Sequence, residues 1–399
     1  MAEQHEKALV PQIRFTGFTD PWEQRKLGEL TEIKDSARIP NRLWREAGVP
    51  YIRASDISQE DLRGALFIDE EDYAAYKAAT GAPEKGDVLF NGGGEIGKAI
   101  INGNSSPIYV QGGAVLYARI AHSSLLDARY LVAAFVTQNV VNAIGVLSAG
   151  GTMKHFTLQP AKNLPIEVPS IAEQRRIGAF FDRLDSLITL HQRKYDKLCV
   201  LKKSMLDKMF PKGGSLYPEI RFAGFTDPWE QRKVQDVADR FDNLRIPVAA
   251  NLRVHGKTPY YGANGIQDYV DGFTHDGEFV LVAEDGANDL KNYPVKCVNG
   301  RIWVNNHAHV LQGKAGIADN SFLAFAISQS DIESLLVGGG RAKLNAETLM
   351  SIEFRLPCLQ EQHQIGEYLT RLDHLITLHQ RKLELLRNIK KSMLDKMFV

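Results

Sequence analysis

The sequence predicts a mixed α/β (α+β) protein with two globular domains separated by two long antiparallel coiled-coil helices, in a pseudo-two-fold tandem repeat. Two 39-residue segments, 172–210 and 360–398, are identical at 25 aligned positions and contain no proline. The motif IRFTGFTDPWEQRK at 13–26 returns at 220–233 with one change in fourteen. The stretches between these repeats differ from each other and mix strand-like with helical patterns. Each repeat is therefore a domain followed by a helix.

The repeats also set the expected boundaries. The first globular domain spans 13–171 and the first long helix spans 172–212. The second domain spans 219–359 and the second helix spans 360–399. At about 1.5 Å per residue each helix is roughly 55–60 Å long. Two such helices, paired antiparallel, would hold the domains at a fixed separation.

The composition is that of a soluble globular protein, with 44% hydrophobic and 24% charged residues. No apolar run reaches the length of a membrane span, and the first ten residues lack the apolar core of a secretory signal. The three cysteines are scattered, which argues against disulfides or a zinc site. We therefore expect a cytoplasmic protein with no membrane partner. The net charge is zero, so charge alone does not predict nucleic-acid binding.

In the first domain, the pattern predicts strands and one long helix. The expected strands are 87–91, 98–103 and 114–120, and the helix is 125–145. An apolar, β-prone segment with a proline, LPIEVPSIAEQ at 164–174, leads into the first long helix. Gly92, Gly94 and Gly97 match the letters of a dinucleotide-binding fingerprint. The following KAIIN is strand-like rather than helical, so we interpret the glycines as a hairpin or tight loop.

The second domain follows the same plan with different residues. Strands are expected at 277–283 and 300–312, a helix at 320–337, and Gly-rich turns at 260–265 and 284–289. Both domains then carry a Gly-rich element that ends in a basic residue, SAGGTMK at 148–154 and GGGRAK at 338–343. Asp20-Pro21-Trp22 and its repeat at 227–229 are interpreted as turns whose tryptophan caps the domain.

In the long segments, apolar residues recur at steps of four and three, the spacing of a coiled-coil seam. The residues expected to pair the helices are Ile177, Phe181, Leu184, Ile188, Leu198 and Met205, and in the second copy Ile365, Leu369, Leu372, Ile376, Leu386 and Met393. His191 and His379 interrupt the seam at equivalent places. We interpret them as polar groups that set the register or as partly exposed seam positions, with a catalytic pair as the alternative.

The motif search yields no catalytic constellation and no metal site. No Walker A motif is present, and no carboxylate cluster typical of a nuclease is evident. His307 and His309 would share one face of a strand, but no cysteine or carboxylate partners are evident for zinc.

Residue types that read DNA bases cluster in both domains. Asparagine bonds adenine, while arginine and lysine bond guanine or phosphate. The candidate DNA-binding residues are Arg53, Asn91, Lys98, Lys154 and His155 in the first domain, and Tyr260, Tyr261, Asn264, Asn305, Asn306, His307, His309, Arg341 and Lys343 in the second. For each one taken alone, a turn or loop role is the alternative.

These features together resemble the DNA-specificity subunit of type I restriction–modification systems, over nearly the whole chain. The resemblance rests on the repeated IRFxGFTDPWEQRK opening, LFNGGGEIGK, PYYGANGIQDYVDGF, VLVAEDGAN, WVNNHAHVL and the RLDxLITLHQRK helices. It implies two target-recognition domains, each of which reads one half of a split sequence in double-stranded DNA. It also implies that the helices set the spacer and dock two modification (methyltransferase) subunits.

According to the same resemblance, the chemistry belongs to other chains. The modification subunits would bring S-adenosylmethionine and methylate adenine, and restriction/translocase subunits would bring ATP and Mg²⁺. This chain is then expected to be non-catalytic and to bind no cofactor. The alternatives are an assembly scaffold or decoy with degenerate DNA recognition, and a stand-alone enzyme.

Overall fold

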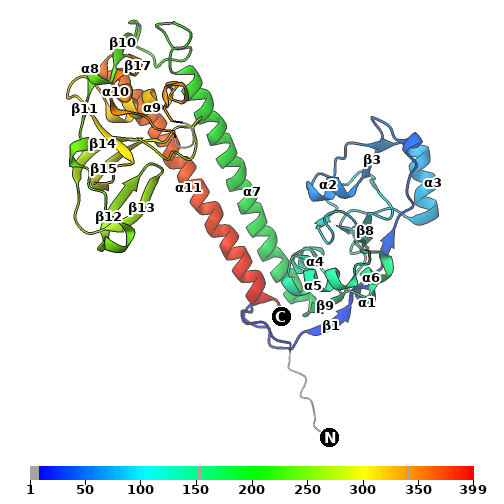
Figure 1. Cartoon of the computed structure of the whole chain (residues 1–399). Helices are drawn as coiled ribbons and strands as arrows, with labels where there is room; N and C mark the ends of the chain where they lie inside the picture. Colours follow the sequence, from blue (N-terminus) through cyan, green and yellow to red (C-terminus); the bar gives the residue numbers. More distant parts are fainter. Residues whose placement is uncertain (1–8, 151–153, 339–341) are drawn as a thin grey trace. The chain divides into compact units, whose positions relative to one another are not determined.

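The structure, a computed structural model, describes residues 9–150, 154–338 and 342–399 (Figure 1). The chain forms two compact units. Unit 1 comprises Met1–His191 and Lys382–Val399, and unit 2 comprises Gln192–Arg381. Each unit therefore contains one globular region together with part of both long helices, α7 (Ile171–Lys208) and α11 (Leu359–Met397). The two predicted long helices are confirmed, while the predicted domain boundaries stay a prediction.

Unit 1 mixes short strands and helices. Its globular region contains, in order, β1 (Glu23–Lys26), α1 (Leu27–Leu30), β2 (Ile33–Asp35), η1 (Asn41–Leu43), β3 (Val49–Ile52), α2 (Ala54–Ser58), β4 (Phe67–Ile68), α3 (Glu70–Thr80), β5 (Val88–Asn91), β6 (Ala99–Ile101), β7 (Tyr109–Val110), β8 (Val115–Ala118), α4 (Ala128–Phe135), α5 (Gln138–Leu147), α6 (Leu158–Lys162) and β9 (Pro165–Val168).

Unit 2 has longer strands. Its globular region contains β10 (Glu230–Lys233), α8 (Val234–Val237), β11 (Ala238–Arg240), η2 (Asp242–Leu244), η3 (Ala250–Leu252), β12 (His255–Gly262), β13 (Gly265–Val270), β14 (His275–Ala283), β15 (Val295–Val304), β16 (Ala308–Gly313), α9 (Asn320–Ser328), η4 (Glu333–Leu335), α10 (Ala346–Ser351) and β17 (Glu353–Leu356).

Each unit has its own central sheet, and the two sheets contain equivalent antiparallel strands. The order of these strands is β2-β8-β5-β6 in unit 1 and β11-β16-β14-β15 in unit 2. Each unit also has a parallel pair: β3 with β7 in a separate sheet of unit 1, and β12 with β15 within the six-stranded sheet of unit 2. The opening and closing strands also pair in each, β1 with β9 and β10 with β17. The mixed α/β fold and the tandem repeat are thus confirmed.

Three predicted elements are corrected because each is interrupted. The helix expected at 320–337 ends with α9 at Ser328, and the separate 3-10 helix η4 follows at Glu333–Leu335. The helix expected at 125–145 is two helices, α4 and α5, because Thr137 has extended backbone and its hydroxyl donates to the Ala134 carbonyl. The strand expected at 300–312 is β15 and β16, joined by a turn at 305–307. Among the described residues no single helix is long and apolar enough to cross a membrane, although α4 and α5, bent by 74°, pass that test together.

Each long helix is attached to its own globular region by a buried arginine–glutamate ion pair, and we call this attachment the joint. The Arg14 guanidinium donates to both oxygens of Glu173, at 2.7 and 2.8 Å. The Arg221 guanidinium contacts Glu361 in the same two-pronged way, at 2.7 Å for both bonds. Glu173 and Glu361 are fully buried and stand in the first turn of α7 and α11, where a carboxylate also favours the helix dipole. The repeated Arg of the opening motif therefore fixes the motif to the helix.

The next residue of each helix completes the joint. The Gln174 amide donates to the carbonyls of Leu125 and Pro169, and its oxygen accepts from the Asp127 nitrogen. Gln362 repeats all three bonds with equivalent backbone atoms in unit 2. The repeated EQ pair of the sequence is thus a structural element.

The glycine near the start of each long helix allows a close helix crossing. A Cβ at Gly178 would lie 2.7 Å from the Tyr130 nitrogen at the start of α4. A Cβ at Gly366 would lie 2.8 Å from Asp319, the N-cap of α9. The first turns of α7 and α11 therefore pack on their own globular regions.

The predicted seam residues lie in the two hydrophobic cores. In unit 1, Ile177, Phe181, Leu184 and Leu386 are buried, and Ile188 and Met393 are partly buried against them. In unit 2, Ile365, Leu369 and Leu372 are buried, and Leu198 and Met205 pack against them. Ile376 is half-buried.

Ion pairs show the antiparallel sense of the helices within each unit. Asp185 of α7 pairs with Lys390 of α11 in unit 1, at 2.5 Å. Phe181, one turn earlier in α7, contacts Phe398, beyond the end of α11. In unit 2, Lys202 pairs with Asp373 at 2.5 Å.

The buried Arg221–Glu361 joint predicts a large effect on stability. Arg221→Ala leaves the Glu361 carboxylate buried and unpaired, so the free energy of unfolding is expected to fall by about 3–5 kcal/mol. The matched control is Arg371→Ala, because Arg371 makes an exposed pair with Glu367 that contributes roughly 0.5 kcal/mol. Urea unfolding followed by tryptophan fluorescence measures both variants. Equal losses in the two variants would refute the role of burial.

Candidate nucleic-acid interface

Predicted residues of unit 1 gather where β5 ends beside α2. Asn91, the last residue of β5, is fully buried, and its amide donates to the Ala54 carbonyl at 3.0 Å and to the Ser58 hydroxyl at 3.2 Å. Arg53 directly precedes α2, and its guanidinium contacts the Asp56 carboxylate. Lys98 forms an ion pair of 2.6 Å with Glu60, just beyond α2.

The glycine loop 92–97 joins β5 to β6 as a hairpin, which confirms the prediction from the sequence. The Asn91 nitrogen donates to the Lys98 carbonyl, and the Gly97 nitrogen donates back to the Asn91 carbonyl. Gly92 is required because a Cβ there would lie 2.6 Å from the Phe156 carbonyl oxygen. His155 is exposed and close to this loop, since a Cβ at Gly93 would lie 3.6 Å from its Nδ1.

Predicted residues of unit 2 gather where three turns meet. Asn264 lies in the β12–β13 turn, and its amide donates to the Gly286 carbonyl at 2.9 Å. Asn305 lies in the β15–β16 turn, where its side-chain oxygen accepts from the His307 nitrogen at 2.8 Å. The His307 ring pairs with Asp285, which follows β14. Asn306 is exposed beside them.

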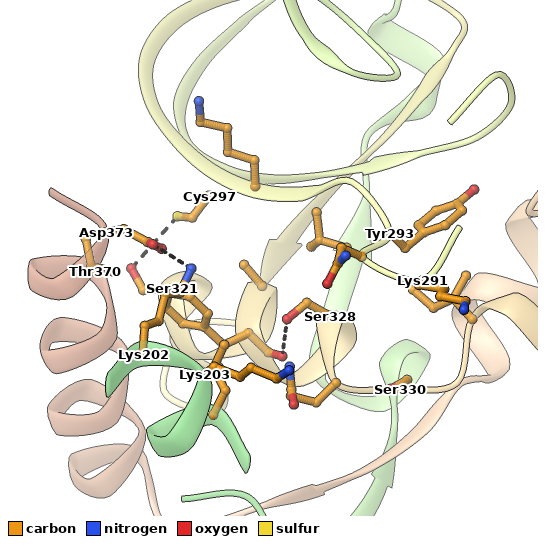
Figure 2. A pocket seen from close by; sticks show the side chains of 18 of the residues that line it. Lys202, Lys203, Lys291, Tyr293, Cys297, Ser321, Ser328, Ser330, Thr370 and Asp373 are labelled. Carbon is orange, nitrogen blue, oxygen red and sulfur yellow. Dashed lines mark hydrogen bonds and ion pairs between the residues drawn. The ribbon is translucent and has the colours of Figure 1, made fainter. Parts of the chain in front are cut away.

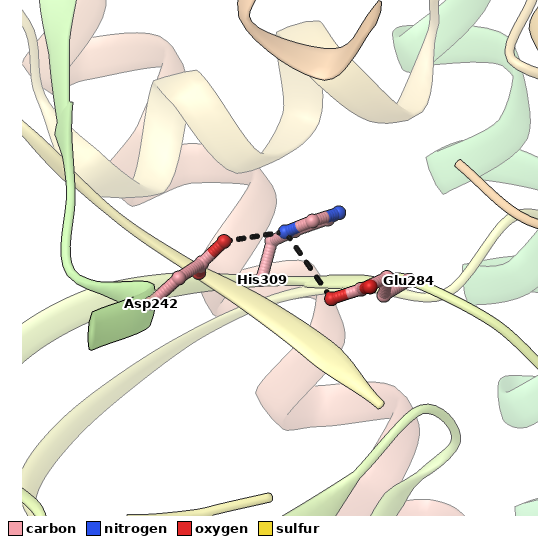
Figure 3. A group of neighbouring side chains, drawn as sticks. All are labelled: Asp242, Glu284 and His309. Atoms are coloured by element: carbon pink, nitrogen blue, oxygen red, sulfur yellow. Dashed lines mark hydrogen bonds and ion pairs between the residues drawn. The ribbon is translucent and has the colours of Figure 1, made fainter. Parts of the chain in front are cut away.

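A charge network stands behind these turns (Figure 3). One potential metal-ligand atom from each of Asp242, Glu284 and His309 lies within 4.8 Å of the other two. His309 Nδ1 is 2.7 Å from Asp242 and 3.7 Å from Glu284, and its Nε2 is 2.9 Å from the Leu344 carbonyl oxygen. Arg245 pairs with Glu284 at 2.7 Å. The grouping resembles metal ligands, but protein cations already compensate its carboxylates.

Lys343 also belongs to this network, because its ammonium is 2.9 Å from the Glu284 carboxylate. Burial disfavours the charged form of Glu284, but hydrogen bonds from Arg245 and Lys343 outweigh it and lower the carboxyl pKa. Burial likewise opposes the charged form of Asp242, and the hydrogen bonds from His309 and the Val310 nitrogen lower its pKa. Both groups are thus held as carboxylates.

The two clusters occupy the same place in equivalent sheets. In unit 1 the ring of Tyr51 on β3 stacks on Tyr109 of β7, with centroids 6.4 Å apart. In unit 2 Tyr260 of β12 stacks on Trp303 of β15, also at 6.4 Å. Parallel strands end at one edge of a sheet, so the residues after β3 and β7 meet, as do those after β12 and β15.

The two Gly-rich elements are also equivalent. Ala149 and His155 form a pair of backbone hydrogen bonds, and so do Val337 and Lys343. The following residues then bond to the turn after the central strand, Phe156 to the Gly92 carbonyl and Leu344 to the Glu284 carbonyl. Each element is thereby anchored at the edge where the candidate residues gather.

Five candidates are buried, so their side chains lie inside the fold, and their contact with DNA stays a prediction. They are Asn91, Tyr260, Tyr261, Asn305 and His309. Tyr260 donates its hydroxyl to the Val248 carbonyl and stacks under the Arg253 guanidinium, while both ring nitrogens of His309 have protein partners. Tyr260 and His309 are thus held by protein partners and position their neighbours.

The other candidates reach the surface. Lys154, His155, Asn264 and Asn306 are exposed, and Arg53, Lys98, His307 and Lys343 are half-buried. Arg341 lies outside the described residues. Reasoning from the sequence missed Gln267 and Asp285, which contact Asn305 and His307. It also missed Gln111, whose nitrogen bonds to the Ile52 carbonyl as that of Asn305 bonds to Tyr261. Aligning YVQGG with WVNNH would have revealed Gln111.

A separate groove of about 1610 Å³ lies in unit 2 between α7, α9 and β15 (Figure 2). Lys202 crosses it to Asp373 and also lies over the Phe325 ring. Burial raises the pKa of the Cys297 thiol to about 12, so this cysteine is held as an unreactive thiol. The groove mixes acidic and basic residues and is distinct from the cluster of turns.

Comparisons with known proteins agree on one family. The family described as "Type I restriction modification DNA specificity domain" matches residues 19–199 and 226–388. A putative type I restriction enzyme specificity subunit of Haemophilus influenzae, S.HindORF215P, is 44% identical over 146 residues, which cover 37% of this chain and 38% of the relative. The putative MjaX specificity subunit of Methanocaldococcus jannaschii is 22% identical and covers 94% of this chain and 92% of its own.

A solved structure supports the fold. The S subunit of a type I restriction-modification system from M. genitalium aligns with a TM-score of 0.65 at 14% identity. The alignment covers 98% of this chain and 99% of that one.

The network around Glu284 predicts an acid-sensitive contribution to stability. The pKa values of Asp242 and Glu284 lie below their ordinary values of 3.8 and 4.5, so this contribution is present above those values and is lost as pH falls through the lowered ones. Glu284→Gln should cost about 1–3 kcal/mol at neutral pH and show less further loss below about pH 4. Urea unfolding at several pH values measures this.

The matched control is Glu353→Gln, because Glu353 is exposed, where it pairs with Lys233 and accepts a hydrogen bond from the Gln231 amide. It should keep the pH dependence of the wild type. Identical pH dependence in Glu284→Gln and wild type would contradict the assigned role of the network.

Proposed function

Because this chain belongs to the family of type I restriction-modification DNA specificity domains, we propose that it recognises a DNA target in two parts. The observation that carries this proposal is that two unlike clusters of base-reading residues occupy the same edge of two equivalent sheets. A shared framework with different residues at its edge suits two different half-sites. The surface candidates are basic side chains in unit 1 and include amides in unit 2, and these groups bond phosphates and base edges.

The two clusters differ in chemistry, which supports the proposal that the two units recognise different base sequences. Unit 1 presents the exposed His155 and Lys154 beside a glycine loop, with Arg53 next to α2. Unit 2 presents Asn264, Asn306 and the His307–Asp285 pair. Each is proposed to face the major groove, with the two half-sites separated by a spacer of about one helical turn, near 34 Å.

The long helices are proposed to set that spacer and to carry the partner chains. Ile188 faces the core of unit 1, whereas Leu187 and Leu190 are 38% and 47% exposed. The repeated positions Leu375 and Leu378 in unit 2 are 42% and 47% exposed. Exposed apolar pairs on a charged helix are typical of protein interaction sites. We assign each pair to one modification subunit.

In this assignment the chain itself is non-catalytic and acts in the cytoplasm. The modification subunits would bind S-adenosylmethionine and methylate adenine within the target. Restriction/translocase subunits would bind ATP and Mg²⁺. An assembly scaffold or decoy is the second candidate, favoured by the zero net charge of the chain.

Mapping methylated adenines tests the proposal directly. Co-expression with the modification subunit in a host that lacks adenine methylation should produce one new motif with two specific halves and an unspecific spacer. Single-molecule sequencing of the genome measures it. A stable complex that writes no motif would support the scaffold instead, and methylation by the chain alone would overturn both.

Inserting one heptad into both long helices tests the spacer. Seven residues add about 10 Å to a helix, which corresponds to roughly three base pairs. The half-sites should stay the same while the spacer lengthens or methylation stops. Methylation with an unaltered spacer would refute the role of the helices.

Charge substitution of the exposed leucines tests docking. Leu190→Glu should remove one modification subunit from the complex, and adding Leu378→Glu should remove both. Mass photometry of the purified complex measures the stoichiometry. Thr189→Glu is the matched control, because Thr189 is an exposed neighbour of Leu190 and should leave two subunits bound. Full binding by the double leucine variant would exclude this surface.

A further inference from the structure

The β12–β13 hairpin of unit 2 contains a β-bulge at Gln267. Tyr261 pairs with Ile266, and Tyr260 pairs with Asp268, so Gln267 has no partner on β12. A bulge leaves its extra residue outside the ladder and re-aims the side chain. The Gln267 side chain is exposed, at the edge where the candidate residues of unit 2 gather.

The backbone opposite Gln267 leaves space for the side-chain amide of Gln267. A Cβ at Gly262 would lie 2.2 Å from Gln267 Nε2, so a larger residue there would displace the Gln267 amide from this position. Asn305 Nδ2 donates to Gln267 Oε1 at 3.4 Å. The bond is long, but it favours one orientation of the Gln267 amide, because the Asn305 NH₂ group can donate to the amide oxygen and not to the amide nitrogen.

Asn305 is itself fixed in orientation. It is 4% exposed, its nitrogen donates to the Tyr261 carbonyl at 3.0 Å, and its Oδ1 accepts from the His307 nitrogen at 2.8 Å. Its Nδ2 therefore points at Gln267 and orients that amide. Gln267 keeps its Nε2 donors and a second lone pair on Oε1 for a partner.

The surroundings of Gln267 suit a groove floor rather than a phosphate. On the same strand, Ile266 and Tyr269 are 45% and 48% exposed, so the hairpin presents apolar and amide groups. Arg253 is paired with Asp268 and lies over the Tyr260 ring. A two-stranded ribbon of this kind fits the major groove of DNA.

We propose that Gln267 reads one adenine in the half-site bound by unit 2, with Asn305 as its positioning residue. Its Nε2 would donate to adenine N7 and its Oε1 would accept from the N6 amine, the bidentate geometry of glutamine on adenine. This inference rests on the proposed function and adds a specificity-determining residue and its base. In unit 1 the short helix α2 follows β3 at this place, so the proposal concerns one half-site alone.

Gln267→Ala and Gln267→Glu in the full complex test the proposal, again by sequencing methylated adenines. Gln267→Ala should make one position in one half-site degenerate and slow methylation of the original site by roughly 10- to 100-fold. Gln267→Glu keeps the shape but replaces the donor by an acceptor, so cytosine should be preferred there. Asn305→Ala should relax the same position, which a merely structural residue would not do.

Gln235→Ala is the matched control, since Gln235 is an exposed glutamine on α8, away from the hairpin in unit 2 (Figure 1). It should leave the motif and the rate unchanged. Thermal melting confirms that the exposed Gln267 variants fold like the wild type. If the wild type writes a two-part motif and both Gln267 variants write the same motif at the same rate, this inference is overturned while the proposed function stands. If the wild type writes no such motif, both fall.

Discussion

The buried ion pair at the start of each long helix is the constraint on which the rest of the structure depends. Arg14 on Glu173, and Arg221 on Glu361, tie the opening motif of a repeat to the first turn of its helix. The adjacent Gln174 and Gln362 then tie that turn to the N-terminus of α4 or α9. Charges this deeply buried tolerate little change in geometry, because any displacement leaves them unpaired in a medium of low dielectric constant. The direction in which each helix leaves its domain is therefore fixed, and both repeats keep the same residues for that purpose.

The sequence predicted the framework better than the surface. Long repeats with helical spacing and no proline carry enough information to predict both helices, and the glycine hairpin at 92–97 followed from the strand-like residues after it. The break between α4 and α5 was missed because Val136 ends α4 and Thr137 begins α5 without a glycine or proline. Turn residues such as Asn264, Asn306 and His307 were grouped by composition, and the structure places them on neighbouring turns. Which candidates are buried depends on pairing between distant strands, and so the burial of His309 and Tyr260 could not be predicted. The bulge at Gln267 has no signature in the sequence, since it arises from the register of two strands.

The division between a repeated framework and unlike edges has a physical basis. Some residues that recur are buried in the cores, such as Trp22 and Trp229, and the recurring Arg and Glu form the ion pairs at the helix starts. The exposed candidate residues that differ between the units lie on turns or beside the ends of strands, where a substitution changes little packing. Sheet order and helix direction can thus persist while the turns change, so that each half of the molecule is free to acquire its own surface. One repeated fold can therefore carry two chemically different recognition surfaces.

The way in which the chain divides between the units bears on the order in which they form during synthesis. Unit 2 is one continuous stretch, 192–381, so every residue of its core is available once that stretch has been made. Unit 1 also needs 382–399, because Phe398 packs against Trp22, Tyr130 and Phe181. The half that is translated first is thus the half that is completed last. Its core lacks Phe398 until the residues at the end of α11 and just beyond it have been synthesised.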